Sequence, residues 1–277
     1  MSTDTHSSDG VRELYEWMTD LMTETHGGHL HGGYWAGPDV PQTVTEAGDR
    51  LTDVVVKRCE LKPGHHVLDV GSGNGNASTQ VAIEHRVRVS GVTVSEYQVQ
   101  VAQQLADKRG LAGTVSFSVA DMRDMPFDDA TFDAAFAIES VCHVPDRTNA
   151  YAEIGRVLRP GGRVVVTDFM LRQPITDPAT AALFATASTT FETAPIVPRA
   201  EYESLVRAAG LEVVEVADIT EAVQPSWRVA AENMRKAWHT HTIKLGEREY
   251  HELVDTLERF GACPELGYVV VVARKPA

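Results

Sequence analysis

Apolar side chains near the start of the chain recur at helical spacing and lie on one face of a helix predicted over residues 11–25. Residues 25–39 predict a loop, because four glycines before Tyr34 prevent regular structure. A second helical pattern covers residues 43–59 and stops at the breaker Lys62-Pro63-Gly64. The chain therefore opens with two helices joined by a glycine-rich loop.

From residue 65 onward, short apolar runs alternate with helical patterns. The apolar runs predict strands at residues 65–70, 87–94, 114–120, 132–138, 163–169, 211–219 and 268–273. Single helices between most of the strands predict a mostly parallel sheet with helices on both faces, which is a doubly wound α/β fold. The last strand follows two helical segments and can lie antiparallel beside the sixth strand.

Two stretches interrupt this rhythm and predict helical insertions. Residues 172–200 are rich in Ala and Thr and contain four prolines, and residues 225–260 show two helical patterns. We expect a flexible tail at residues 1–10, a helical cap at residues 11–60 and an α/β core at residues 61–277. Both insertions belong to the core and are expected to form a lid over it.

Composition and charge narrow the classes of partner. Hydrophobic residues make up 43% of the 277 residues and charged residues 23%, which is ordinary for a soluble globular protein. The 25 basic and 39 acidic side chains give a net charge of −14, which disfavours nucleic acid and anionic membrane surfaces. The chain shows no signal peptide, and no apolar run approaches the ~20 residues that span a bilayer. We expect a cytoplasmic protein with a small-molecule partner, and a homo-oligomer is compatible with the sequence.

Neither cysteine nor histidine spacing indicates a metal site. Cys59, Cys142 and Cys263 include no CxxC pair, which argues against a disulfide framework or a zinc knuckle. His239 and His241 are two residues apart, so they cannot face each other on a helix. We therefore expect no bound metal and a reducing compartment.

The most informative stretch is the apolar strand end Val67–Val70 followed by Gly71-Ser72-Gly73-Asn74-Gly75. Glycines at such a turn allow positive φ and let backbone N–H groups approach a ligand closely. A dinucleotide motif needs its third glycine at position 76, which is Asn76, and no lysine occupies the P-loop position. The pattern therefore disfavours NAD and ATP, and a tight turn without a ligand is the alternative to a cofactor site.

Two further strand ends carry polar side chains. The second predicted strand ends near Thr93 without an acid at its tip, and Gln98 follows in the next helix. A neutral amide can donate to and accept from ribose hydroxyls, although Gln98 can alternatively be an exposed helix residue. The third strand ends in Asp121-Met122. These ends lie at the carboxyl edge of the sheet, where open α/β folds bind their ligands.

In order and spacing, these motifs and the segment Val157–Gly162 resemble those of class I S-adenosylmethionine-dependent methyltransferases. Almost the whole chain is similar to actinobacterial small-molecule methyltransferases of the rebeccamycin sugar O-methyltransferase type. That similarity includes His31–Trp35, Ile138–Asp146, Thr167–Phe169 and Gly267–Pro276. The resemblance implies the strand order 3-2-1-4-5-7-6 with strand 7 antiparallel, S-adenosyl-L-methionine as cofactor, and a role in natural product or antibiotic biosynthesis.

The resemblance also implies which residues bind the cofactor. Thr93 and Gln98 would contact its ribose and methionine portions, Asp121 would accept from its adenine amino group, and Met122 would pack on the ring. Aromatic residues of the cap cover the sulfonium in relatives, and an aromatic face attracts a cation by ~0.5–2 kcal/mol. The complete set is Asp69, Gly71, Ser72, Gly73, Thr93, Gln98, Asp121, Met122, Glu139, Tyr15 and Tyr34.

His143 and Asp168 are the candidate catalytic pair, because both follow or end strands that face the crevice of the glycine loop. An alcohol loses its proton as the new O–C bond forms, and an imidazole suits that task near neutral pH. Asp168 would hold the ring in the correct tautomer. Relatives often carry a His-His pair where this chain has Cys142-His143, so the first histidine of that pair has no counterpart here.

The leading hypothesis is O-methylation of a hydroxylated natural product with His143 as the general base. One alternative is C-methylation of an alkene or prenyl chain, with Glu139 as a cation-stabilising carboxylate. Another is a methyltransferase fold that catalyses cyclisation without methyl transfer. Apolar and aromatic residues of the lid are expected to line the acceptor site, namely Phe184, Phe191, Trp227, Met234 and Trp238.

Overall fold

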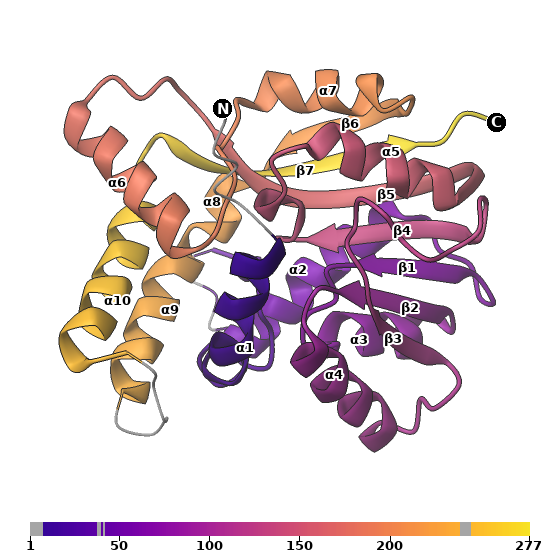
Figure 1. Ribbon diagram of the computed structural model, residues 1–277, viewed down its shortest axis with the longest axis horizontal. Helices are drawn as coiled ribbons and strands as arrows, with labels where there is room; N and C mark the ends of the chain where they lie inside the picture. The colour runs from indigo at the N-terminus through magenta and orange to yellow at the C-terminus, as the bar shows by residue number, and fades with distance from the viewer. Residues whose placement is uncertain (1–7, 38–39, 41, 239–244) are drawn as a thin grey trace.

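In the computed structural model, which describes residues 8–37, 40, 42–238 and 245–277, seven strands form one sheet (Figure 1). The strands are β1 (His66–Val70), β2 (Arg88–Thr93), β3 (Val115–Val119), β4 (Phe132–Ile138), β5 (Leu158–Leu171), β6 (Glu212–Asp218) and β7 (Leu266–Arg274). Their order is β3-β2-β1-β4-β5-β7-β6. Strand β7 runs antiparallel to both neighbours, and the other pairs are parallel. The fold class and strand order implied by the resemblance are confirmed.

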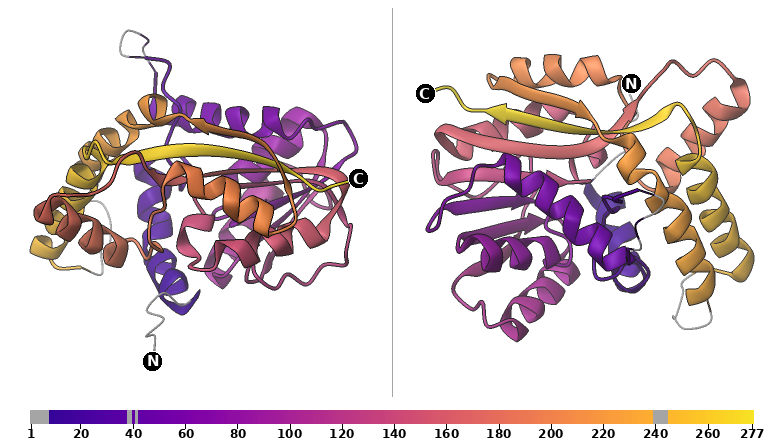
Figure 2. Two further views of the ribbon diagram at one scale, coloured as in Figure 1. Left: turned by 90° about the horizontal axis from the view of Figure 1, so that it is seen from above. Right: turned by 180° about the vertical axis from the view of Figure 1, so that it is seen from behind.

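Helices cover both faces of this sheet, as the view from above in Figure 2 shows. Side chains of α2 (Val44–Arg58), α3 (Asn76–His85) and α4 (Glu96–Lys108) join one apolar cluster against one face. Helices α5 (Arg147–Val157) and α7 (Arg199–Ala208) join a second cluster against the other face. Alternate residues of the central strands enter opposite clusters, so these strands are apolar almost throughout.

The remaining helices gather where the parallel strands end, on the left of Figure 1. Helix α1 (Ser8–Thr25) packs with α9 (Pro225–Ala237) and α10 (Glu247–Gly261) in a third apolar cluster. Helix α6 (Pro178–Thr190) packs against α10, and the short α8 (Thr220–Val223) leads into α9. The first helix and the late insertions therefore form one layer over the carboxyl ends of the strands.

The first helix differs from the sequence-based expectation at its N-terminal end. Helix α1 begins at Ser8, so part of the predicted tail is helical, and Asp9 in the first turn complements the helix dipole. Residues 1–7 lie outside the described residues, as do residues 239–244 with His239 and His241. Of the described helices, none is long and apolar enough to cross a membrane.

Strand β5 is longer than the sequence predicts, because it begins at Leu158 and continues through Pro160-Gly161-Gly162. Leu158 pairs with Phe132 of β4, and a register shift follows in that strand pair. The Gly161 N–H donates to the carbonyl of Lys275 at 2.9 Å. The Pro-Gly-Gly segment therefore forms an irregularity inside a strand, where the sequence predicts a break before one.

Candidate active site

Two cavities meet beneath the cap, where the parallel strands end. The first cavity, of about 1040 Å³ with its open mouth, lies between α1, the Gly71–Asn76 loop and the ends of β2, β3 and β4. The second cavity, of about 900 Å³, lies between α1, α9, α10 and the ends of β5 and β7. The side chains that border both cavities, here called the shared wall, are Tyr15, Leu30, His31, Glu139 and His143. Molecules held in the two cavities would meet at this wall.

The loop after β1 forms a cradle for a ligand in the first cavity. Gly71, Gly73 and Gly75 have φ of +80°, +51° and +79°, a region that residues with side chains rarely adopt. A Cβ on Gly71 would lie 2.2 Å from the Cβ of Ser140, so only glycine fits there. The Ser72 hydroxyl is buried and has no hydrogen-bond partner among the described residues. An unpaired hydroxyl in a cavity wall fits a ligand that completes its hydrogen bonding.

Asp69 precedes this loop and lines the first cavity, although it is only 3% exposed. Its Oδ2 accepts a hydrogen bond from the Ser78 hydroxyl at 2.5 Å. Burial raises the pKa of the Asp69 carboxyl to about 7, and the bond from Ser78 opposes this rise. A cation bound in the first cavity would favour the ionised form.

The raised pKa of Asp69 predicts how stability without ligand depends on pH. Between about pH 4 and pH 7, the folded chain keeps a proton that the unfolded chain, with Asp69 at its ordinary 3.8, has lost. Relative to Asp69→Asn, the free energy of unfolding of the wild type should therefore fall as pH rises through this window, by at most ~1.4 kcal/mol per pH unit. Above about pH 7 the difference should level off. Urea titrations of both proteins from pH 5 to 8 measure it, and parallel curves would contradict the raised pKa.

Polar side chains at the end of β2 tie the sheet to the cap. Thr93 Oγ1 donates to Gln98 Oε1 at 2.5 Å, and Gln98 Nε2 donates to Thr19 Oγ1 in α1 at 3.2 Å. Gln98 is 3% exposed, so the alternative of an exposed helix residue is wrong. Thr93 and Gln98 both line the first cavity. A ligand there would touch groups that also hold α1 in place.

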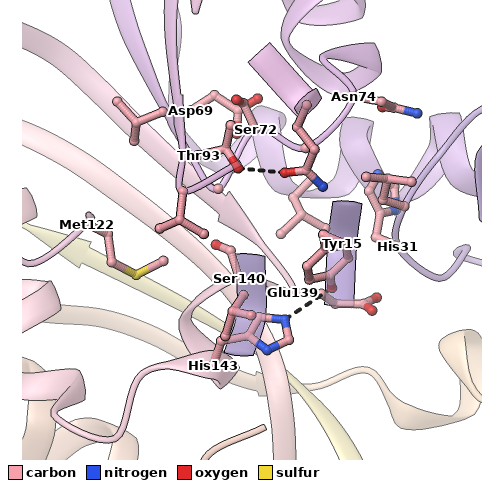
Figure 3. Close-up of a pocket in the computed structure, with 18 of the residues that line it drawn as sticks. Tyr15, His31, Asp69, Ser72, Asn74, Thr93, Met122, Glu139, Ser140 and His143 are labelled. Carbon is pink, nitrogen blue, oxygen red and sulfur yellow. Dashed lines mark hydrogen bonds between the residues drawn. The ribbon is translucent and has the colours of Figure 1, made fainter. Parts of the chain in front are cut away.

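Asp121 and Met122 follow β3 and line the first cavity. In Figure 3 Met122 and His31 lie on opposite sides of this cavity. Asp121 accepts from Arg123 Nε at 2.9 Å and from Nη2 at 2.7 Å, and these bonds lower the pKa of Asp121. The carboxylate is therefore ionised and oriented, and its oxygens have further lone pairs for a ligand.

Glu139 follows β4 and connects three parts of the fold. Its Oε1 accepts from the Gly32 N–H of the cap loop at 2.8 Å and from the Tyr268 hydroxyl of β7 at 2.7 Å. Its backbone is left-handed, with φ of +49°. Burial raises the pKa of the Glu139 carboxyl to about 7, and both hydrogen bonds oppose this rise. A buried carboxyl is thus held in the shared wall.

His143 lies in the short 3-10 turn Val141–His143, directly after β4. Its Nδ1 lies 2.8 Å from the carbonyl oxygen of Glu192, and Nδ1 carries the proton because a carbonyl can only accept. Nε2 of the neutral ring is then an acceptor, and the Tyr15 hydroxyl donates to it at 3.1 Å (dashed line in Figure 3). Burial raises the pKa of Tyr15, so the phenol stays protonated. The basic nitrogen of His143 therefore lies in the shared wall beside Tyr15.

The predicted pairing of Asp168 with His143 is corrected by the structure. Asp168 is fully buried and lines neither cavity. Its Oδ1 accepts from the Phe169 N–H at 2.7 Å, and its Oδ2 lies 3.6 Å from Nε of the buried Arg147. The Glu192 carbonyl occupies the position at Nδ1 that the sequence assigns to Asp168. Asp168 instead belongs to a buried ion pair behind the site.

Tyr34 is the second predicted site residue that lies elsewhere. It lines neither cavity, its side chain packs against the apolar core cluster, and its N–H donates to the Ala47 carbonyl at 2.8 Å. Trp35 Nε1 donates to Ser226 Oγ at 2.9 Å and so fastens the loop to α9. From the same loop, His31 reaches the shared wall, and no sequence signal distinguishes it from its neighbours.

The lid residues also divide between the second cavity and the packing around it. Three predicted residues line the cavity, namely Phe191, Trp227 and Met234. Phe184 packs on Phe260 and Trp238 packs on Tyr250, each with ring centroids 5.0 Å apart. Helix α1 supplies residues that periodicity marks only as buried, namely Leu14, Met18 and Met22. Periodicity does not distinguish contact with core from contact with a cavity.

Comparison with known proteins gives close relatives over the whole chain. Residues 68–166 match a family model described as a methyltransferase domain. The chain is 37% identical to the O-methyltransferase cnsE of Penicillium expansum, over 96% of this chain and 92% of that protein. It is 35% identical to the 27-O-demethylrifamycin SV methyltransferase of Amycolatopsis mediterranei (strain S699), over 95% of each chain.

Solved structures share the same architecture. The cyclase SpnF is 30% identical, with a TM-score of 0.84 over 98% of this chain and 97% of that one. A geranyl diphosphate methyltransferase is 21% identical, with a TM-score of 0.77 over 97% of this chain and 98% of that one. The second likeness supports the fold alone.

Proposed function

The chain belongs to the S-adenosylmethionine-dependent methyltransferases, and on this premise we propose that it methylates a hydroxyl group of an apolar natural product. We propose that His143 Nε2 accepts the hydroxyl proton during this reaction. The observation that carries the proposal is the position of His143, which borders both cavities and has Nδ1 bonded to the Glu192 carbonyl. A group in the second cavity can therefore meet both a base and a cofactor.

The residues of the first cavity fit S-adenosylmethionine, which when bound supplies an electrophilic methyl group on a positively charged sulfur. The left-handed glycines let backbone N–H groups approach a ligand, and the Ser72 hydroxyl lacks a partner within the described part of the chain. Glu139 and Tyr15 suit a cation, because a carboxylate and an aromatic face both attract one. The residues proposed to hold the cofactor are Asp69, Gly71, Ser72, Gly73, Thr93, Gln98, Asp121 and Met122.

The shared wall is arranged to take one proton from an acceptor. We propose that the acceptor hydroxyl replaces the Tyr15 hydroxyl at His143 Nε2, and that its proton moves to this nitrogen as the oxygen attacks. The Glu192 carbonyl keeps Nδ1 protonated and stabilises the imidazolium that forms. The α1 helix and the two cavity walls orient the reactants, which supplies most of the rate enhancement.

The similarity to the cyclase SpnF supports a second candidate, cyclisation of a bound molecule without methyl transfer. Such a reaction would use the second cavity to shape its substrate and would not need His143. C-methylation of an alkene would instead rely on the Glu139 carboxylate to stabilise a carbocation. Similarity over the whole chain to relatives named as O-methyltransferases favours O-methylation.

A transfer assay separates these candidates. The protein is incubated with S-adenosylmethionine carrying a carbon-13 methyl group and with hydroxylated natural products, including 27-O-demethylrifamycin SV. We expect S-adenosylhomocysteine and a labelled methoxy group in equal amounts. A cyclised product without S-adenosylhomocysteine would establish the second candidate, and a labelled methyl group on carbon would establish C-methylation.

Asp121→Ala is expected to weaken S-adenosylhomocysteine binding about tenfold, or ~1.4 kcal/mol, because it removes an ionised hydrogen-bond acceptor from the first cavity. Isothermal titration calorimetry gives the dissociation constants. Asp124→Ala is the matched control, since Asp124 is exposed and lies three residues further along. The control should bind like the wild type, and equal binding by Asp121→Ala would remove Asp121 from the cofactor site.

A further inference from the structure

The charged groups around the second cavity are unevenly distributed, and the inference drawn from them rests on the proposed function. The described residues that line this cavity include no lysine and no arginine, and they contribute one carboxyl group, that of Glu139. An anion entering the cavity would therefore find no cationic side chain among these residues to pair with. Burial of an unpaired charge is unfavourable, so the lining opposes anionic acceptors.

His31 gives this lining a hydrogen-bond acceptor. Its Nδ1 lies 2.7 Å from the Gly32 carbonyl, which can only accept, so Nδ1 carries the ring proton. Burial lowers the pKa of His31 to about 3, which keeps the ring neutral. Its Nε2 is buried and lacks a hydrogen-bond partner within the ranges that the structure describes. A donor group on a ligand would complete this nitrogen's bonding.

The orientation of His31 is built into the site by the Gly32 peptide. The Gly32 N–H donates to Glu139 Oε1 at 2.8 Å, while the carbonyl of the same residue accepts from His31 Nδ1. A Cβ on Gly32 would lie 3.2 Å from Glu139 Oε1 and 3.3 Å from Ser226 Oγ, which leaves little room for the loop to shift. His31 therefore presents Nε2, rather than an N–H group, to its surroundings.

A second histidine of the lining has the same polarity. His26 Nδ1 lies 2.9 Å from the Thr25 hydroxyl oxygen, and that hydroxyl donates its own hydrogen to the Leu21 carbonyl at 2.8 Å. His26 Nδ1 must then be the donor, and its Nε2 is an acceptor. Burial lowers the pKa of His26 to about 4, so this ring is also neutral. Two histidines and Glu139 thus give the second cavity acceptors and no cationic donor.

We infer that the second cavity selects uncharged acceptors that carry a hydrogen-bond donor besides the hydroxyl that is methylated, and that this donor binds His31 Nε2. The substrate class is a polyhydroxylated molecule with an apolar body, which packs against the methionine and aromatic side chains of α1 and α9. Phosphorylated, sulfated and carboxylated molecules of the same shape are excluded, because the lining offers them no counter-charge.

Three probes with one ring system test this inference by calorimetry on the full chain saturated with S-adenosylhomocysteine. They are a naphthalene with two adjacent hydroxyl groups, its dimethyl ether, and the sulfonate of the diol. We expect the diol to bind about tenfold more tightly than either of the others, a step of the size that one hydrogen bond or one unpaired charge produces. The ether tests the donor and the sulfonate tests the charge.

Substitutions at His31 and Met22 test which residues cause the donor preference and the exclusion of charge. His31→Phe should reduce the preference for the diol over the ether from about tenfold to about twofold or less, because the acceptor nitrogen is lost. Met22→Lys should raise the affinity for the sulfonate about tenfold by adding a cation to the second cavity, and the matched Met22→Gln should not. Retained affinity for S-adenosylhomocysteine reports that each variant is folded.

The inference is overturned if the sulfonate binds the wild type as tightly as the diol. It is also overturned if folded His31→Phe keeps the full preference for the diol, or if the diol does not bind at all. Should His31→Phe fail to fold, the two Met22 variants still decide the charge selection. These measurements need no turnover, so failure of the proposed function appears separately, as absence of S-adenosylhomocysteine in the transfer assay.

Discussion

His143→Ala is expected to lower kcat for methyl transfer by ~10²–10⁴-fold, the range that a positioned general base supplies. The variant removes the only group through which the shared wall is proposed to take the acceptor proton, and it leaves the glycine loop untouched. The dissociation constant of S-adenosylhomocysteine should therefore stay near that of the wild type. Steady-state rates with an acceptor that the transfer assay identifies as a substrate, together with calorimetry, measure the two quantities independently.

Tyr15→Phe is the control for His143→Ala, because it removes a hydrogen-bond partner of the imidazole and keeps the imidazole itself. The Tyr15 hydroxyl donates to His143 Nε2 but, in the proposed reaction, leaves that nitrogen before the proton is transferred. Loss of the hydroxyl should therefore cost about tenfold or less in kcat, much less than loss of the imidazole. A His143→Ala enzyme that transfers methyl groups at the wild-type rate would refute the base assignment and favour C-methylation.

Arg147→Met is expected to lower the free energy of unfolding by ~3–5 kcal/mol, the largest stability effect we expect for a single substitution. Arg147 is 3% exposed and Asp168 is fully buried, so the variant leaves a carboxylate without its counter-charge. It also removes the bond from Arg147 Nη1 to the Pro195 carbonyl at 2.9 Å, near the segment that holds His143. Urea denaturation at neutral pH gives the change.

The double variant Arg147→Met with Asp168→Leu separates the charge effect from lost packing. Removal of both charges should recover most of the lost stability, because burial alone raises the pKa of Asp168 and opposes its charge. Its kcat should stay within about tenfold of the wild type, since the Glu192 carbonyl rather than Asp168 bonds His143. A loss of kcat as large as that of His143→Ala would show that Asp168 contributes to catalysis. An Arg147→Met variant as stable as the wild type would refute the ion-pair argument.

Much of the first cavity is predictable from sequence because its signals are local. Strands of a parallel sheet end at one edge, so the positions of Asp69, Thr93 and Asp121 at strand ends are enough to group them in one site. The strand order also follows from the family resemblance. The continuation of β5 through Pro160-Gly161-Gly162 could not be predicted from sequence. It depends on a hydrogen bond from Gly161 to Lys275, which lies far along the chain.

The partner of His143 illustrates a different limit. The atom that fixes its tautomer is the backbone carbonyl of Glu192, and every residue type carries such a carbonyl. A search for side chains therefore turns to Asp168, which is suitable in chemistry and position along its strand but is already paired with Arg147. The sequence also does not predict that His31 rather than Tyr34 lines the cavity. The packing of the glycine-rich loop decides which of these side chains faces it.

The left-handed backbone of Glu139 has a consequence for engineering this enzyme. A non-glycine residue with φ of +49° costs the folded state on the order of 1 kcal/mol. Glycine or asparagine would relieve this backbone strain at position 139. The same exchange would discard the carboxylate that anchors Gly32 and Tyr268. Loss of that acceptor costs ~1–3 kcal/mol for each group left unpaired, which exceeds the relieved strain, so selection for thermostability alone should also retain Glu139.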